Sequence, residues 1–162
     1  EFAIANRGSY LPAFAAGTDP GAVEGDVKTR WHVTVKCPTS VAYSPDPLLA
    51  VASRTESRVL IWRLPMASGA KKRSLSVDES PVKVEFSVDG ALLLVGTAMS
   101  VALYDSAKLT QLLSLAQGCC GVSKQPYVQF TPDGQSLALH SPFVTPPTLV
   151  LWDIARSLRS PT

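Results

Sequence analysis

The sequence has little charge and very little histidine or cysteine, and these shortages exclude several classes of protein. Only 17% of the 162 residues are charged, and the formal net charge is +2. A chain so balanced lacks the electrostatic footprint of a protein that binds nucleic acid or an anionic membrane. Two histidines and three cysteines, none at a metal-ligand or redox spacing, predict neither a metal site nor a bound cofactor.

The cysteines also bear on the compartment. Cys119 and Cys120 are adjacent, a placement that suits no ordinary disulfide, and the third cysteine has no obvious partner. We therefore expect reduced thiols in an intracellular, cytoplasmic protein.

Long hydrophobic runs are missing as well. The longest apolar stretch, residues 91–104, is broken by Gly96, Thr97 and Ser100, so it is too short to span a bilayer. We expect no membrane partner. The chain begins Glu1-Phe2, with neither an initiator methionine nor a signal pattern, and we expect it to be a piece of something longer.

Recognisable catalytic motifs are absent too. There is no phosphate-binding glycine loop, no zinc-protease helix motif and no nucleophile elbow around Ser141. His140 is interpreted as structural, and Asp46, Asp89 and Asp133 as turn residues. The sequence therefore predicts no catalytic residue, no small-molecule substrate and a protein that is not an enzyme. An enzyme on the same fold remains an alternative, and it would need clustered acids or metal ligands.

What the sequence does contain is an internal repeat. Thirteen prolines and ten glycines, with abundant valine, leucine and serine, favour an all-β chain rich in turns. An aromatic residue recurs at Tyr43, Phe86 and Phe130, each followed three residues later by an aspartate. The interval is about 43 residues, which is typical of four-stranded repeats.

Each unit shows the same order of predicted strands. An alternating strand ends at the aromatic residue, and two strands that are apolar on both faces follow the turn. The second of these strands ends at Trp62, Tyr104 or Trp152. A weaker fourth strand is expected near 73–77 and 110–115, and the third unit lacks a clear one. Its absence predicts an incomplete last unit.

The repeat resembles the WD40 family. Trp152-Asp153 matches the family's Trp-Asp pair, Tyr104-Asp105 is a common variant, and Trp62-Arg63 departs from it. The Gly-His dipeptide of many members is missing, which puts their buried hydrogen-bond network in doubt. The resemblance implies a partial β-propeller of about three four-stranded antiparallel blades. The expected boundaries are 39–78, 79–122 and an incomplete 123–162, after an irregular segment, 1–38, that could be a degenerate blade.

In the WD40 family, partners usually bind at the end of the propeller where the second and third strands of each blade are joined. The connections between blades lie at the same end. In this sequence that end would hold residues 54–57, 78–80, 98–100, 117–125 and 141–147. The candidate partner-binding residues are Arg54, Glu56, Met99, Lys124 and Phe143. Phe143 lies in the longest of the loops that join a second to a third strand, where it either anchors a partner or folds back onto its own blade.

These features favour a non-catalytic scaffold that binds other proteins within a multiprotein complex. An alternative comes from the third unit, which is similar to propellers of eukaryotic translation initiation factors such as initiation factor 2A. It would make the ribosome or an RNA–protein complex the partner. The one basic run, Lys71-Lys72-Arg73, is interpreted as a solvated strand edge, with contact to RNA or lipid as the alternative.

Overall fold

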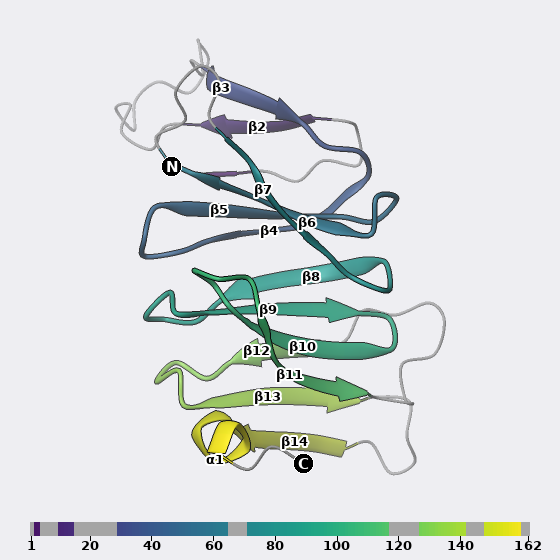
Figure 1. The fold of residues 1–162 in the computed structure, drawn as a ribbon, viewed down its shortest axis with the longest axis vertical. Helices are drawn as coiled ribbons and strands as arrows, with labels where there is room; N and C mark the ends of the chain where they lie inside the picture. The colour runs from purple at the N-terminus through teal and green to yellow at the C-terminus, as the bar shows by residue number, and fades with distance from the viewer. Residues whose placement is uncertain are drawn as a thin grey trace, which may run out of the picture.

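The computed structural model describes residues 2–3, 10–14, 29–64, 71–116, 127–141 and 148–159. Most of these residues lie in antiparallel β-sheets, which stack along the long axis of the molecule (Figure 1). The predicted all-β class is confirmed. Across the described residues, no helix combines the length and the hydropathy needed to cross a bilayer.

Each repeat forms one sheet whose strands follow chain order. The first sheet contains β4 (Pro38–Tyr43), β5 (Leu48–Ser53), β6 (Arg58–Arg63) and β7 (Arg73–Ser76). The second contains β8 (Pro81–Phe86), β9 (Leu92–Thr97), β10 (Ser100–Asp105) and β11 (Gln111–Ala116). The third contains β12 (Tyr127–Phe130), β13 (Ser136–Ser141) and β14 (Thr148–Asp153). This repetition of antiparallel sheets is compatible with a β-propeller.

The third sheet is incomplete in the described part of the chain, as the sequence predicts. Where the first two sheets continue into a fourth strand, the chain enters helix α1 (Ile154–Arg159) directly after β14. Asp153 caps this helix, because its Oδ1 accepts the amide hydrogen of Arg156 at 2.8 Å. Asp105 makes the equivalent contact with the amide of Lys108 at 2.7 Å. In both strands, the aspartate that follows the aromatic residue therefore marks the end of the strand, because its carboxylate holds the turn or helix that comes next.

The segment 1–38 contains strands of its own. β1 (Phe2–Ala3), β2 (Tyr10–Phe14) and β3 (Thr29–Thr34) pair antiparallel in the order β1-β2-β3. β3 lies at one edge of this sheet. Whether the sheet is a degenerate blade stays a prediction.

The turns between the first two strands of each unit explain the repeated aspartate. The Asp89 carboxylate accepts hydrogen bonds from the Ser87 hydroxyl at 2.6 Å and from the amide of Ala91 at 3.0 Å. Asp133 does the same with Thr131 and Gln135 at 2.6 and 3.0 Å. Both turns need the glycine that follows, because Gly90 and Gly134 adopt φ values of 74° and 68°.

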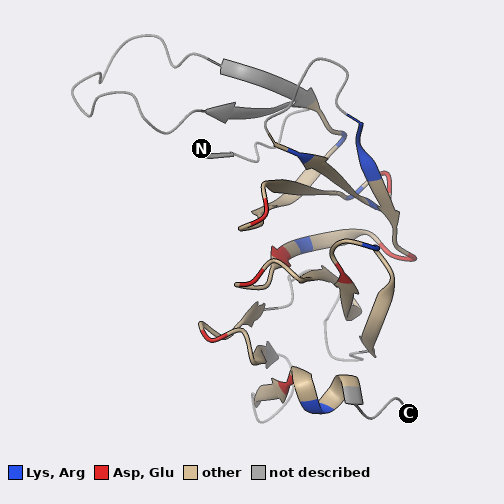
Figure 2. Ribbon diagram, turned by 60° about the vertical axis from the view of Figure 1, so that its left-hand side comes forward, with Lys and Arg blue, Asp and Glu red and all other residues tan. Residues whose placement is uncertain are grey.

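The first unit has Pro47 in place of that glycine, and its turn differs. All three turns close through an amide that donates across the turn, but in the first unit Ser44 reaches the carbonyl of Leu48, four residues on, at 3.0 Å, whereas Ser87 and Thr131 reach carbonyls five residues on. Figure 2 shows acidic residues at the tips of the three turns, along one border of the stack.

The sheets are held together by apolar side chains between them. Val59 and Ile61 of β6 pack in one cluster with Val84 and Phe86 of β8. The next interface repeats this arrangement: Val101 and Leu103 of β10 share a cluster with Val128 and Phe130 of β12. The aromatic residues at 86 and 130 thus occupy equivalent places in consecutive sheets.

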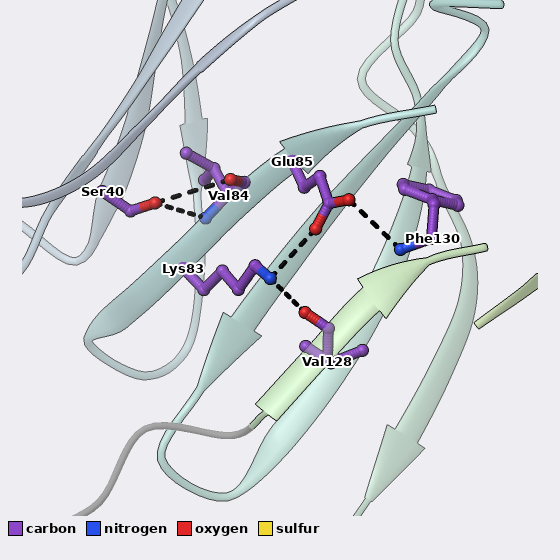
Figure 3. A network of polar contacts seen from close by, with 6 residues as sticks. All are labelled: Ser40, Lys83, Val84, Glu85, Val128 and Phe130. Carbon is purple, nitrogen blue, oxygen red and sulfur yellow. Dashed lines mark hydrogen bonds and ion pairs between the residues drawn. The ribbon is translucent and has the colours of Figure 1, made fainter. Parts of the chain in front are cut away.

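Polar side chains join the first strands of neighbouring sheets (Figure 3). Ser40 Oγ accepts the amide hydrogen of Val84 at 3.1 Å. Lys83 Nζ donates to the carbonyl of Val128, and Glu85 Oε1 accepts the amide hydrogen of Phe130 at 3.2 Å. Lys83 and Glu85 also form an ion pair at 3.0 Å. The polar residues of the alternating strand therefore reach toward the next sheet, opposite to its apolar residues.

Candidate interaction surface

One end of the stack gathers the loops that the repeat predicts to lie together. The β5–β6 turn, the β9–β10 turn and the connection from β7 to β8 all lie on the right in Figure 1. The turns that carry the repeated aspartates lie at the opposite end. This end, formed by residues 54–57, 78–80 and 98–100, is called the loop surface below.

Thr97 ties two of these loops together. Its buried Oγ1 accepts the amide hydrogens of Ser100 and Met99, at 2.9 and 3.2 Å, and lies 2.9 Å from the Ser100 hydroxyl. The same hydroxyl also bonds to the carboxylate of Glu79, which lies in the connection from β7 to β8. The β9–β10 turn is thus fixed both to its own strand and to the neighbouring connection.

The structure places three of the five predicted partner-binding residues on the loop surface. Arg54 and Glu56 are exposed on the β5–β6 turn, and Met99 is 48% exposed on the β9–β10 turn. Ser57 closes the first of these turns with a positive φ of 48°. Lys124 and Phe143 lie outside the described residues, so their placement stays a prediction.

Sequence reasoning missed a polar hollow beside the loop surface. The hollow has a volume of about 120 Å³, and its lining includes Asp78, Glu79, Tyr104 and Gln111. The Tyr104 hydroxyl donates to Gln111 Oε1 at 3.2 Å. Burial, followed by the nearby charge of Asp78, raises the pKa of Tyr104 above its usual value. The adjacent acidic residues at 78 and 79 could have indicated this hollow in the sequence. The other residues that line it come from separate strands.

A second hollow, of about 210 Å³, opens between the first two sheets near the opposite end. Arg63, Lys71 and Arg73 line it together with Asp46. Lys71, Lys72 and Arg73 are all exposed, and β7 is an edge strand, as predicted for the basic run. The alignment of these cations with Arg63 depends on the pairing of β6 with β7. Within the described ranges, no group of three or more histidine, cysteine or acidic residues could hold a metal ion.

Comparison with known proteins gives a structural match alone. No protein-family model matches the sequence, and no curated protein matches it. Similar folds occur in 504 solved chains, so this arrangement of sheets is common. One of them is hydrazine synthase of Kuenenia stuttgartiensis, with a TM-score of 0.64 and 20% sequence identity. The alignment covers 80% of this chain and 38% of that one, so the chain spans well under half of the protein it resembles.

This comparison contradicts the expectation that the protein is not an enzyme. Hydrazine synthase, an enzyme by its name, shares the fold with this chain. The expectation was wrong because it treated missing sequence motifs as a property of the fold, whereas one fold can host catalytic and binding sites alike. At 20% identity the likeness concerns the fold, and it transfers no reaction to this chain.

Proposed function

We propose that this chain is part of a WD40-type β-propeller that acts as a protein-interaction scaffold within a multiprotein complex. The observation that carries this proposal is the loop surface. The Thr97 hydrogen bonds hold two of its three loops in place, and Arg54, Glu56 and Met99 project from two neighbouring sheets. Loops that are already ordered lose little conformational entropy when a partner binds.

The chemistry of the loop surface fits a protein partner. An exposed methionine adapts its shape to an apolar contact, while the arginine and the glutamate on the β5–β6 turn can form charged hydrogen bonds with a partner. Cys37 is free and exposed, which agrees with the cytoplasmic location included in this proposal.

The test compares two exposed apolar residues at opposite ends of the stack. Met99→Asp changes the loop surface, and Val88→Asp changes the turn at the other end, where Val88 is 60% exposed. Chemical crosslinking in cells, followed by mass spectrometry, should show partners that are lost with Met99→Asp and retained with Val88→Asp. Equal partner profiles for both variants and the parent protein would refute binding through the loop surface.

A second candidate function is association with the ribosome, as in a translation initiation factor. The specific support is the hollow where Arg63, Lys71 and Arg73 converge, since clustered cations contact RNA phosphates. Co-sedimentation with ribosomes should fall as salt rises, and Lys71→Glu combined with Arg73→Glu should abolish it. Lys108→Glu, at an exposed position on the β10–β11 turn, is the matched control. Absence of the parent protein from ribosomal fractions at low salt would exclude this function.

A further inference from the structure

The hollow between the first two sheets gathers three cations on one face of the first sheet. Ile61 of β6 packs toward the second sheet, and Arg63 lies two residues further along the same strand, so both side chains lie on that face. Arg73 of β7 pairs directly with Ile61, and directly paired residues share a face. Lys71 precedes Arg73 by two residues and also lines the hollow. The pairing of β6 with β7 therefore brings together cations that lie apart in the sequence.

These cations are not neutralised within the described part of the chain. There, an ion pair joins Lys83 and Glu85, whereas Arg63, Lys71 and Arg73 form none. Asp46 is the one acidic residue among the described residues that line the hollow. Three cations and one carboxylate leave an excess of two positive charges. Such an excess favours a ligand with about two negative charges.

The second sheet supplies the opposite wall of the hollow and holds it in place. Ser106 and Ala107, on the β10–β11 turn, line this wall. The Ser106 hydroxyl donates to the carbonyl of Gly90 at 2.6 Å, and its amide donates to the carbonyl of Ala91 at 2.9 Å. The wall is therefore ordered before any ligand binds, which lowers the entropic cost of binding.

The size and lining of the hollow restrict the ligand. Its volume is about 210 Å³. Sites for drug-sized ligands measure about 300–1,000 Å³, so a nucleotide exceeds this space, whereas a phosphate group on a short aliphatic stem fits it. Leu48 and Ile61 also line the hollow and offer such a stem an apolar contact. A phosphate monoester carries a charge of about −1.5 to −2 at neutral pH, close to the positive excess, whereas each phosphodiester of RNA carries about one negative charge.

We propose that this hollow, called the basic hollow below, binds the phosphate monoester of a phosphorylated serine or threonine on a protein partner. Each arginine, Arg63 and Arg73, can bind phosphate oxygens through two parallel hydrogen bonds, and Lys71 adds a third positive charge. The inference rests on the proposed scaffold function, because it names the chemistry of a partner. It places that partner's phosphate at a site other than the loop surface, and it makes binding conditional on phosphorylation.

Nuclear magnetic resonance titration of the full chain with a short alanine peptide that carries a central phosphoserine tests this binding. We expect saturable shifts of the Ala107 amide. The affinity should fall about tenfold or more in Arg63→Glu and in Arg73→Glu, because each variant removes charged hydrogen bonds. Arg63→Lys should also weaken binding although it preserves the charge, since an ammonium group lacks the arginine fork. Arg156→Glu, at an exposed position on α1, is the matched control and should bind like the parent protein. Absence of saturable shifts, or an equal loss in Arg156→Glu, overturns the proposal.

Three further probes identify the source of the phosphate. The unphosphorylated peptide should not bind. Inorganic phosphate should bind more weakly than the phosphopeptide, because it has no stem to contact Leu48 and Ile61. A short RNA with hydroxyl ends, which carries phosphodiesters alone, should bind more weakly still. Tighter binding of the RNA than of the phosphopeptide would assign the basic hollow to RNA, and equal binding of inorganic phosphate would mean an adventitious ion only. Either result overturns the proposal.

Failure of this inference is distinguishable from failure of the proposed function. If the phosphopeptide does not bind while Met99→Asp still loses crosslinked partners, the basic hollow is refuted and the loop surface stands. If the phosphopeptide binds and depends on Arg63 and Arg73 while Met99→Asp loses no partner, the loop surface is refuted and the basic hollow stands.

Discussion

At the level of single residues, the turn after the first strand of a unit restricts which residue can occupy its glycine position. Gly90 and Gly134 have nearly the same positive φ, but their surroundings differ. A Cβ added at Gly90 would lie 2.6 Å from Ser44 Oγ, in the turn of the preceding sheet, whereas at Gly134 the nearest atom would be 3.9 Å away. Gly134 therefore only provides the positive φ that its turn needs. Gly90 provides the same φ and also leaves room for the two sheets to approach each other.

We expect Gly134→Ala to lower the free energy of unfolding by about 1–2 kcal/mol, because an L residue is strained at positive φ. Gly90→Ala should cost more, since the added methyl group also meets Ser44. Urea denaturation of both variants measures the difference. Adding Ser44→Ala to Gly90→Ala should remove the excess, and equal costs for the two single variants would contradict the close approach.

The turn aspartates predict how stability depends on pH. The hydrogen bond from Ser87, and then the backbone amide of Ala91, lower the pKa of Asp89 below its usual value, and Thr131 and Gln135 act likewise on Asp133. A carboxyl whose pKa is lower in the folded state stabilises the fold above its unfolded pKa of about 3.9, and this contribution disappears as the pH falls through the folded pKa.

Asp89→Asn should therefore be less stable than the parent protein at neutral pH, and the difference should shrink below pH ~4. Urea denaturation at successively lower pH tests this, with Asp105→Asn, whose carboxylate caps the β10–β11 turn, for comparison. A difference that stays constant down to strongly acidic pH would show that the charge of Asp89 is not involved.

At the level of elements, the first strand of a sheet contacts the preceding sheet with the side chains of one face and the following sheet with those of the other. In β8, Val84 and Phe86 pack backward against the first sheet, while Lys83 and Glu85 bond forward to the backbone of β12. Alternation in the sequence predicts that the two sides differ. The partners of the polar side are backbone atoms about 45 residues away, a separation that no local pattern specifies.

Glu85→Ala should cost about 1–2 kcal/mol, because it leaves the amide of Phe130 without its acceptor. Alanine fits this position, since Ala42 occupies it in the first sheet. Hydrogen exchange at the Phe130 amide should accelerate, while exchange at the Ala91 amide, held by Asp89, should not change. Unchanged exchange at Phe130 would show that Glu85 contributes little to holding the sheets together.

Thr97→Val should loosen the loop surface while it preserves the shape of the side chain. It removes the acceptor for two loop amides and the bond to Glu79, and we expect a loss of about 1–3 kcal/mol. Ser100→Ala, which removes only a contact between two hydroxyls, is the milder control. Faster exchange at the Met99 amide in Thr97→Val alone would support the role of Thr97, and equal exchange in both variants would argue against it.

At the scale of the whole molecule, stability arises from sheets that cover each other in series. β5 is buried at every residue and β10 at its four central residues, because each lies between two neighbours. β14 has almost the same apolar sequence but exposes Leu149 and Leu151. The environment of a strand therefore depends on its position in the stack as much as on its composition.

Equivalent leucines should differ accordingly. Leu103→Ala should cost about 2–5 kcal/mol, since it opens a cavity between the second and third sheets. Leu151→Ala, at the same place in β14, should change the free energy of unfolding by less than about 1 kcal/mol in the isolated chain. Thermal or urea denaturation of the two variants measures this contrast, and similar losses would mean that the face of β14 is already covered.

Local sequence patterns were sufficient to predict the all-β class, the order of the strands, the turn residues and the lack of a fourth strand directly after β14 in the described residues. These follow from local chemistry: alternating apolar residues, Asp-Gly pairs and apolar runs of strand length act within a few residues of each other. No sequence pattern indicates that Thr97 bonds to Glu79, that Lys83 bonds to Val128, or that Leu151 is exposed while Leu103 is buried. Those contacts join residues from separate strands and sheets, and they form only when the sheets stack.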